Sequence, residues 1–230
     1  MTRFGGRRIT TLLFDLDETL YQPETGLLKQ IDRRIEGFLQ KKLGMDKSAG
    51  AELRQKYYRQ YGTTLRGLKE AHGVDPQEYC AYTYQLDVGK YLKPNPVLYE
   101  ILMRIPAQKV VFSNSPRRHV YRVLQTLQIH QCFSKIFDIE FTNYLGKPHR
   151  LSYEMVMESL GVSGHECILL DDQPVNLEPA RELGIITVLV GEEAKKNTTV
   201  DYKIEVVEEI AEVWADITGK ELKKTGSDLL

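Results

Sequence analysis

The amino-acid sequence predicts an α/β protein with a doubly wound, mainly parallel, Rossmann-like sheet and a helical domain inserted after the first strand. Five short runs rich in Ile, Val, Leu and Phe lack polar alternation, as expected for strands covered on both faces; they span residues 9–14, 109–112, 135–141, 167–170 and 185–190. Helical patterns alternate with the last four runs, which is typical of a parallel sheet with crossover helices.

The crossover segments carry apolar residues at helical spacing. Residues 117–129 and 174–184 each present one apolar face, and the second segment closes on a glycine that is typical of a helix end. Residues 151–162 are predicted to contain a helix that buries Leu151, Met155 and Leu160 and ends before Gly161. These segments would cover the two faces of the sheet.

A stretch without strand signals interrupts the alternation. Residues 23–92 are helical in pattern throughout, and five apolar side chains share one side of the first segment: Leu28, Ile31, Ile35, Phe38 and Leu39. The "KPNP" sequence at 93–96 restricts the backbone and is predicted to return the chain to the sheet. We therefore expect a helical domain at residues 21–93 and an α/β core domain formed by residues 1–20 and 94–230.

Composition excludes several classes of partner. With 31 Lys and Arg against 32 Asp and Glu, the chain lacks an overall basic field, so we expect neither a nucleic-acid polymer nor a membrane surface as its partner. The three cysteines are far apart and predict no disulfide frame or zinc site. The apolar run near the N-terminus is too short for a signal peptide, which predicts a cytoplasmic protein.

Polar residues follow four of the five apolar runs. They are Asp15 and Asp17, Ser113 and Asn114, Lys147 in the loop after the third run, and Asp171 with Asp172. Ligands of open α/β sheets bind beyond the carboxyl ends of the strands, so these groups would meet in one crevice. Crowded carboxylates repel one another, and Mg²⁺, which prefers oxygen ligands and shares them with phosphate, would relieve this repulsion. The pattern predicts a site for magnesium and phosphate.

Each signal has a plainer structural explanation when it stands alone. An aspartate at a strand end is often a turn former or a helix cap, and a lysine before proline is usually a solvated surface charge. The order of the signals, each behind its own apolar run, favours a functional site.

The same residues resemble a known family. "DLDET" at Asp15, "SNS" at Ser113, "GKP" at Lys147 and "LLDDQPVNLEPARELG" from Leu169 are similar to the four motifs of the haloacid dehalogenase superfamily of phosphohydrolases. The helical insertion resembles the cap domain of that superfamily. Within it, "YGTTLRGLKEAHGVD" at residues 61–75, together with "YLKPNPVLYEIL", resembles the pyrimidine 5'-nucleotidase subgroup.

The resemblance implies a role for each motif residue. Asp15 would attack phosphorus, form an aspartyl-phosphate and ligate Mg²⁺. Asp17 would act as acid and then base, and its backbone carbonyl would also contact the metal. Ser113 and the adjacent backbone at Asn114 would bind phosphate oxygens, and Lys147 would neutralise both the phosphate and Asp15.

The fourth motif departs from a common family form, in which a second acid follows the aspartate four residues later. Counting from Asp172, that position holds Asn176. We therefore expect Asp172 to be the inner metal ligand. Asp171 is either a direct metal ligand or a residue that contacts the metal ligands.

The helical insertion offers candidates for substrate contacts. Arg66 and Tyr61 are the predicted contacts, beside Gly62 and Gly67, which would let the backbone approach a ligand; a surface salt bridge is the plainer explanation for Arg66. Helix packing explains Tyr57 and Tyr58 better than base stacking does. The five histidines have no metal-ligand spacing and are expected to be surface or satisfied residues: His72, His119, His130, His149 and His165.

The sequence thus favours a Mg²⁺-dependent phosphomonoesterase that acts on a small phosphorylated metabolite, foremost a pyrimidine nucleoside 5'-monophosphate. A phosphosugar or phosphoglycolate phosphatase is the main alternative, because the cap sets specificity. A 2-haloacid dehalogenase needs neither metal nor a second acid, so Asp17 and Asp172 argue against it. A non-catalytic binding protein would be expected to lack Asp15, Asp17 or Lys147. Monomer and homodimer both remain open.

Overall fold

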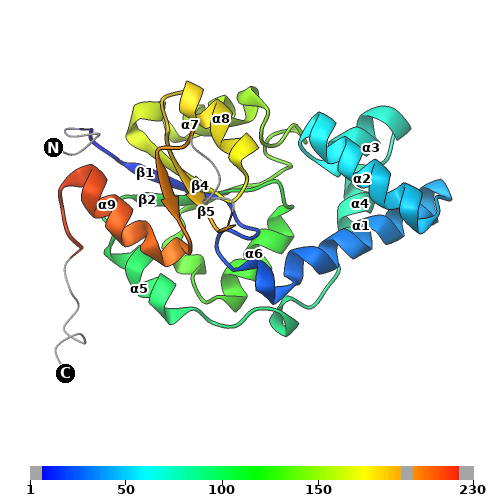
Figure 1. Cartoon of the computed structure of the whole chain (residues 1–230), viewed down its shortest axis with the longest axis horizontal. Coiled ribbons are helices and arrows are strands. Elements are labelled where there is room, and N and C mark those ends of the chain that lie inside the picture. The colour runs from blue at the N-terminus through cyan, green and yellow to red at the C-terminus, as the bar shows by residue number, and fades with distance from the viewer. Residues whose placement is uncertain (1–6, 193–198, 223–230) are drawn as a thin grey trace.

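One parallel sheet forms the centre of the protein (Figure 1). The computed structural model describes residues 7–192 and 199–222. Within these residues six strands pair in the order β3-β2-β1-β4-β5-β6, and every pairing is parallel. The strands are β1 (Thr11–Phe14), β2 (Gln108–Phe112), β3 (Lys135–Phe137), β4 (Cys167–Asp171), β5 (Ile186–Val190) and β6 (Tyr202–Ile204). The predicted doubly wound α/β fold is confirmed.

Helices cover both faces of the sheet (Figure 1). One face packs against α5 (Pro96–Arg104), α6 (Arg117–Thr126) and α9 (Ile210–Thr218), and the other against α7 (Arg150–Leu160) and α8 (Pro174–Glu182). Because side chains alternate along a strand, Leu12 and Phe14 of β1 join the first apolar cluster, whereas Leu13 joins the second. Burial on both faces explains why the strand sequences lack polar alternation.

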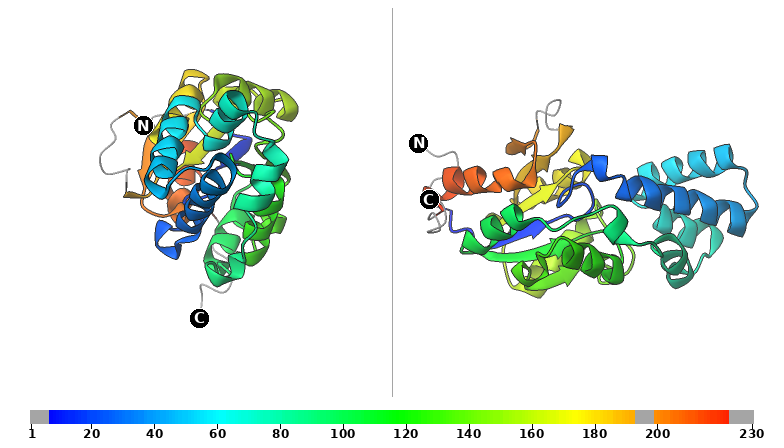
Figure 2. Two further views of the ribbon diagram at one scale, coloured as in Figure 1. Left: turned by 90° about the vertical axis from the view of Figure 1, so that its right-hand side faces the viewer. Right: turned by 90° about the horizontal axis from the view of Figure 1, so that it is seen from below.

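Four helices form the insertion between β1 and β2: α1 (Leu27–Leu43), α2 (Lys47–Tyr61), α3 (Thr64–His72) and α4 (Pro76–Thr83). They lie together to one side of the sheet (Figure 2). The buried side of α1 consists of Leu27, Ile31, Ile35, Phe38 and Leu39. Residues 23–92 are all described and contain no strand, as the sequence predicted. Among the described residues, none of the helices has the length and apolar character needed to span a bilayer.

The strands differ from the prediction in two places. The third apolar run was predicted as a strand to residue 141, but β3 ends at Phe137 because the buried Asp138 accepts hydrogen bonds from the backbone N–H groups of Arg117 (3.0 Å) and Phe141 (2.9 Å), which turn the chain. The edge strand β6 was not predicted. Its three residues are too few to carry a periodic signal.

The predicted buried face of α7 was wrong at Leu151, whereas Leu160 packs against the second apolar cluster. Leu151 is 46% exposed, whereas Ser152, Tyr153 and Val156 are buried. The Tyr153 ring packs edge-on against Phe112 at 5.2 Å, and its hydroxyl donates to the Asn176 carbonyl at 2.6 Å. These contacts with β2 and α8 rotate the helix so that its first leucine faces outward.

The packing of α3 on α2 leads to a stability prediction for Gly67. A Cβ atom at Gly67 would lie 2.3 Å from Cγ of the buried Tyr57, so Gly67→Ala should lower the free energy of unfolding by about 1–3 kcal/mol. At Gly50 the nearest atom would be 3.7 Å away, and Gly50→Ala should raise that free energy by about 0.5–1 kcal/mol through helix propensity. Urea denaturation followed by circular dichroism measures both, and equal stability of the two variants would contradict this packing.

Candidate active site

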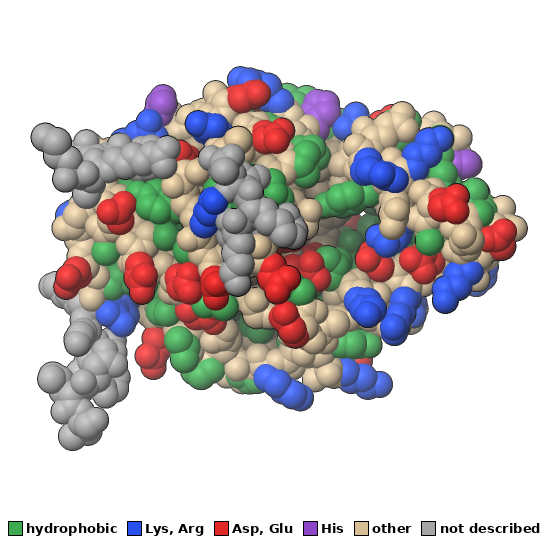
Figure 3. Space-filling model, in the orientation of Figure 1, with side chains coloured by type: hydrophobic (Ala, Val, Ile, Leu, Met, Phe, Trp, Pro, Cys, Tyr) green, Lys and Arg blue, Asp and Glu red, His purple; other side chains and the backbone are tan. Residues whose placement is uncertain are grey.

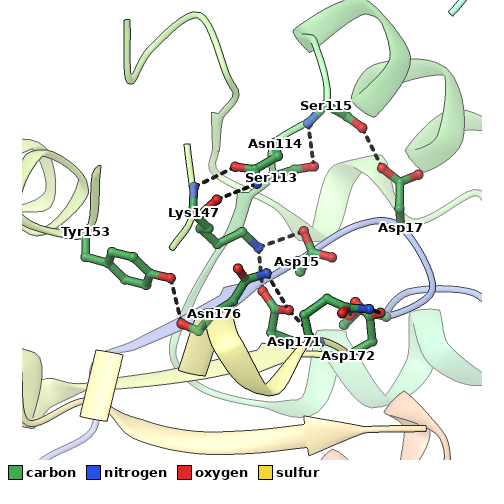
Figure 4. Close-up of polar contacts among 12 residues, drawn as sticks. Asp15, Asp17, Ser113, Asn114, Ser115, Lys147, Tyr153, Asp171, Asp172 and Asn176 are labelled. Atoms are coloured by element: carbon green, nitrogen blue, oxygen red, sulfur yellow. Dashed lines mark hydrogen bonds and ion pairs between the residues drawn. The ribbon is translucent and has the colours of Figure 1, made fainter. Parts of the chain in front are cut away.

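A buried lysine joins the ends of two neighbouring strands (Figure 4). Lys147 Nζ lies 2.8 Å from Oδ1 of Asp15, which follows β1, and 2.6 Å from Oδ2 of Asp171, which ends β4. The Lys147 side chain is 1% exposed. Burial alone would lower the pKa of Lys147, but the two carboxylates raise it overall, so the ammonium stays charged.

Three carboxylates gather around this lysine. Oxygens of Asp15, Asp171 and Asp172 lie within 4.8 Å of one another, and these residues form a group able to hold a metal ion. Burial, followed by the charge of Asp171, raises the Asp15 pKa to about 7 despite Lys147, and burial raises the Asp172 pKa well above its usual range. One ammonium cannot balance three buried carboxylates, so a divalent cation with a preference for oxygen fits this donor set.

The loop that carries Lys147 is fixed by Asn114. The Asn114 amide donates to the Lys147 carbonyl (2.9 Å), and its oxygen accepts from the Lys147 N–H (2.7 Å). Gly146 precedes with a φ of +65°, and a Cβ there would lie 2.6 Å from the Asn114 oxygen. Both polar atoms of the Asn114 side chain thus bind the Lys147 backbone, and the phosphate contact expected from Ser113 and the backbone at Asn114 stays a prediction. Ser113 lines the cavity beside it.

Asp17 faces a different set of partners. Its Oδ1 accepts from the Tyr21 hydroxyl (2.6 Å) and from His119 Nε2 (3.2 Å), and its Oδ2 accepts from the Ser115 hydroxyl (2.5 Å). Burial would raise the Asp17 pKa, yet the hydrogen bonds and charge attraction from these partners lower it overall. The sequence predicted that His119 would be a surface residue or one whose polar atoms are hydrogen-bonded. It gave no sign of the contact with Asp17, because the two residues lie 102 positions apart.

Hydrogen bonds between the end of β4 and the first residues up to and within α8 fix the side chains of the fourth motif. Asp171 Oδ1 accepts from the Asn176 amide and from the Gln173 N–H, both at 2.9 Å, so both Asp171 oxygens are engaged once Lys147 is counted. Asp172 accepts from the Gln173 amide at 2.5 Å. Asn176, which stands where the family form has an acid, thus binds Asp171 as a hydrogen-bond donor.

A cavity of about 280 Å³ opens between this cluster and the helical insertion. Figure 3 shows the surface hollowed there. Asp15, Asp17, Ser113, Asn114, Lys147 and Asp172 line it on the sheet side. The insertion contributes Asp32, Arg54, Tyr58, Gly62, Thr63 and Thr64. The structure therefore brings the site residues predicted at the strand ends, apart from Asp171, to one cavity. Side chains of α1, α2 and α3 form the wall of that cavity on the side of the insertion.

Tyr61 and Arg66, the predicted substrate contacts, do not line this cavity. Arg66 pairs with Glu70 at 2.9 Å, as its plainer explanation expected, and its guanidinium lies 6.0 Å from the centre of the Tyr61 ring. Arg54 and Tyr58 occupy the cavity wall instead, and Arg54 pairs with Asp32 at 2.9 Å. Tyr61, the last residue of α2, instead packs its ring against that of Tyr57, with 5.7 Å between the ring centres.

Of the two glycines predicted to let the backbone approach a ligand, Gly62 lines the cavity and Gly67 does not. Gly67 accommodates the Tyr57 ring within the insertion. At Gly62, whose φ is +81°, a Cβ would lie 2.6 Å from the Lys147 carbonyl oxygen and 2.5 Å from Pro148. Gly62 therefore lets the insertion pack directly on the lysine loop.

Comparison with known proteins agrees with this architecture. The family model for haloacid dehalogenase-like hydrolases matches residues 9–184. Phosphate metabolism protein 8 of Saccharomyces cerevisiae is 26% identical over 187 residues, which are 75% of this chain and 58% of that protein, so the chain spans less than two thirds of this relative.

Two solved structures share the fold at low sequence identity. The HAD phosphatase from Thermococcus onnurineus has a TM-score of 0.62 at 17% identity, covering 94% of this chain and 100% of that one. The HAD-hydrolase YfnB from Bacillus subtilis, solved bound to magnesium, has a TM-score of 0.62 at 16% identity and covers 90% and 99% of the two chains.

The excess of buried negative charge leads to a prediction about metal binding. Adding Mg²⁺ to metal-free protein should raise its thermal unfolding midpoint, because an ion that binds only the folded state stabilises it by mass action. Asp172→Asn should reduce this shift. Asp32→Asn, which removes an acid of the same cavity outside the cluster, should leave the shift intact. Differential scanning calorimetry with and without Mg²⁺ measures it, and an unmoved wild-type midpoint would rule out the metal site.

Proposed function

This chain belongs to the haloacid dehalogenase-like hydrolase family, and on that premise we propose that it is a Mg²⁺-dependent phosphomonoesterase. The observation that supports this most strongly is the buried lysine between Asp15 and Asp171, with Asp172 beside them at the floor of the cavity. A carboxylate nucleophile, a fixed ammonium and an acidic metal group are what phosphoryl transfer to an aspartate requires.

In the proposed reaction Asp15 and Asp17 divide the chemistry. An Asp15 carboxylate oxygen forms a bond to phosphorus as the bond from phosphorus to the leaving oxygen breaks, and Asp17 donates a proton to that oxygen. Water then attacks the aspartyl-phosphate while Asp17 accepts its proton, which releases inorganic phosphate and restores Asp15. Lys147 favours the ionised form of Asp15 and neutralises charge on the phosphate.

The acidic group is proposed to hold Mg²⁺. Asp15, Asp172 and the backbone carbonyl of Asp17 are the proposed ligands, whereas Asp171, already bonded at both oxygens, orients Lys147. When bound, the ion supplies positive charge that offsets the phosphate and the carboxylates.

We propose a pyrimidine nucleoside 5'-monophosphate as the substrate. Tyr58 and the polar groups of Arg54 and Asp32 line the part of the cavity formed by the insertion, which acts as a cap over the phosphate site. A tyrosine ring can cover a base while charged side chains bind its edge. A relative named for phosphate metabolism is compatible with this reaction class.

A substrate panel tests the proposed activity as a whole. Phosphate release should be seen from nucleoside monophosphates with Mg²⁺ and should cease in excess chelator. If sugar phosphates or phosphoglycolate are hydrolysed with higher kcat/KM than every nucleotide, the alternative phosphatase class replaces the nucleotidase. Full activity in excess chelator would favour dehalogenase-like chemistry, and no turnover at all would favour a binding protein.

The nucleophile is tested by Asp15→Asn. This change preserves volume but removes the attacking carboxylate, so turnover should fall by several orders of magnitude while the fold is retained. Phosphate release and circular dichroism measure the two effects. Substantial activity in a folded variant free of wild-type enzyme would exclude Asp15 as the nucleophile.

Base selection is tested with two tyrosines of α2. Tyr58→Ala should lower the ratio of kcat/KM for UMP to kcat/KM for AMP, because Tyr58 lines the cavity. Tyr61→Ala is the matched control and should leave the ratio unchanged, since Tyr61 packs against Tyr57 at 5.7 Å away from the cavity lining. Steady-state kinetics with both nucleotides decide it. A ratio that responds to Tyr61 and not to Tyr58 would refute this part of the proposal.

A further inference from the structure

Three segments of the chain converge on the Asp17 carboxylate. Tyr21 comes from the loop after β1, Ser115 follows β2 (Figure 4), and His119 lies in the first turn of α6. Together they donate two hydrogen bonds to Oδ1 and one to Oδ2. A carboxylate oxygen has two lone pairs directed at hydrogen-bond donors. Oδ1 is therefore saturated, and Oδ2 keeps one free position.

His119 is placed where an apolar residue would pack at lower cost. Its side chain is completely buried, its ring lies 4.9 Å from the Tyr84 ring, and its Nδ1 has no hydrogen-bond partner among the described residues. Burying a polar group without a partner is unfavourable. The bond from Nε2 to Asp17 is thus the one polar interaction that the imidazole makes within the described chain.

We infer that Tyr21 and His119 are positioning residues, which hold the Asp17 carboxylate so that Oδ2 transfers the proton to and from the leaving oxygen. This inference rests on the proposed role of Asp17 as the acid. Tyr21 is buried and contacts Asp17 through its hydroxyl, while Asp17 itself lines the cavity. Both positioning residues contact Oδ1 of Asp17, and neither lines the cavity.

A positioning role predicts a dependence on the leaving group. Protonation by Asp17 matters for a basic alkoxide and matters little for p-nitrophenolate, which leaves without a proton. The ratio kcat/KM includes only the steps up to departure of the alcohol, so it does not report the later hydrolysis of the aspartyl-phosphate. A merely structural defect would slow both kinds of substrate alike.

The test compares kcat/KM for a nucleoside monophosphate and for p-nitrophenyl phosphate in full-length protein with Mg²⁺. Tyr21→Phe and His119→Leu should each lower the first by roughly 10- to 100-fold, the loss expected when a hydrogen bond to a charged group is removed. The second should change by less than about threefold. His119→Gln, whose amide can donate from nearly the same place, should recover most of the loss.

His72→Leu is the matched control. His72 also makes one hydrogen bond through Nε2, to Tyr57 at 2.8 Å within the insertion, so its loss should show no selectivity for the leaving group. If Tyr21→Phe folds and turns over both substrates like wild type, or slows both equally, the positioning role is overturned, even where His119→Leu fails to fold.

Asp17→Asn separates this inference from the proposed function. Selective loss of the nucleotide reaction in Asp17→Asn, without selectivity in the Tyr21 and His119 variants, overturns the positioning role and leaves the phosphatase mechanism standing. Absence of selectivity in Asp17→Asn itself overturns the acid role of Asp17 and the inference with it.

Discussion

The burial of one ammonium between two carboxylates is the constraint on which the rest of the site depends. An ion removed from water is costly unless partners with good geometry surround it, and Lys147 meets this requirement only because Asp15 and Asp171 stand on adjacent strands. The pairing of β1 with β4 is therefore part of the site. Lys147 lies in a loop, and the Asn114 side chain is hydrogen-bonded to both its backbone N–H and its backbone carbonyl. These two bonds fix the backbone from which the flexible lysine side chain extends.

The same lysine loop also seats the helical insertion. Gly62 brings the end of α2 against the Lys147 carbonyl and Pro148, an approach that a side chain would block. The wall of the cavity and the ammonium at its floor are consequently coupled by direct backbone contact. The position of the insertion and the position of Lys147 therefore depend on each other, even though Gly62 and Lys147 are far apart in sequence.

Two aspartates separated by one residue have opposite electrostatic environments. Asp15 lies in a buried acidic group that raises its pKa to about 7, with one ammonium as the opposing influence. Asp17 is also largely enclosed, but the hydrogen bond and charge attraction of His119, with hydrogen bonds from Ser115 and Tyr21, lower its pKa. Such a division is how neighbouring carboxyl groups come to take different parts in a reaction. In this chain the two residues lie beyond the end of β1, and Asp17 stands in the turn that follows, where its side chain meets Tyr21, Ser115 and His119 while Asp15 meets Lys147.

The local sequence was enough to predict five of the six described strands, the strand-free insertion and the polar residues that end β1, β2 and β4, since apolar runs and strand ends are properties of adjacent residues. It could not assign the face of α7, where contacts of Tyr153 with Phe112 and Asn176 expose Leu151. Nor could it show that Asn114 binds the lysine backbone, that His119 reaches Asp17, or that Tyr58 and Arg54 replace Tyr61 and Arg66 at the cavity. Each of these depends on how one helix or loop is rotated against another, and that rotation is decided by packing between segments distant in the chain, which no local pattern records.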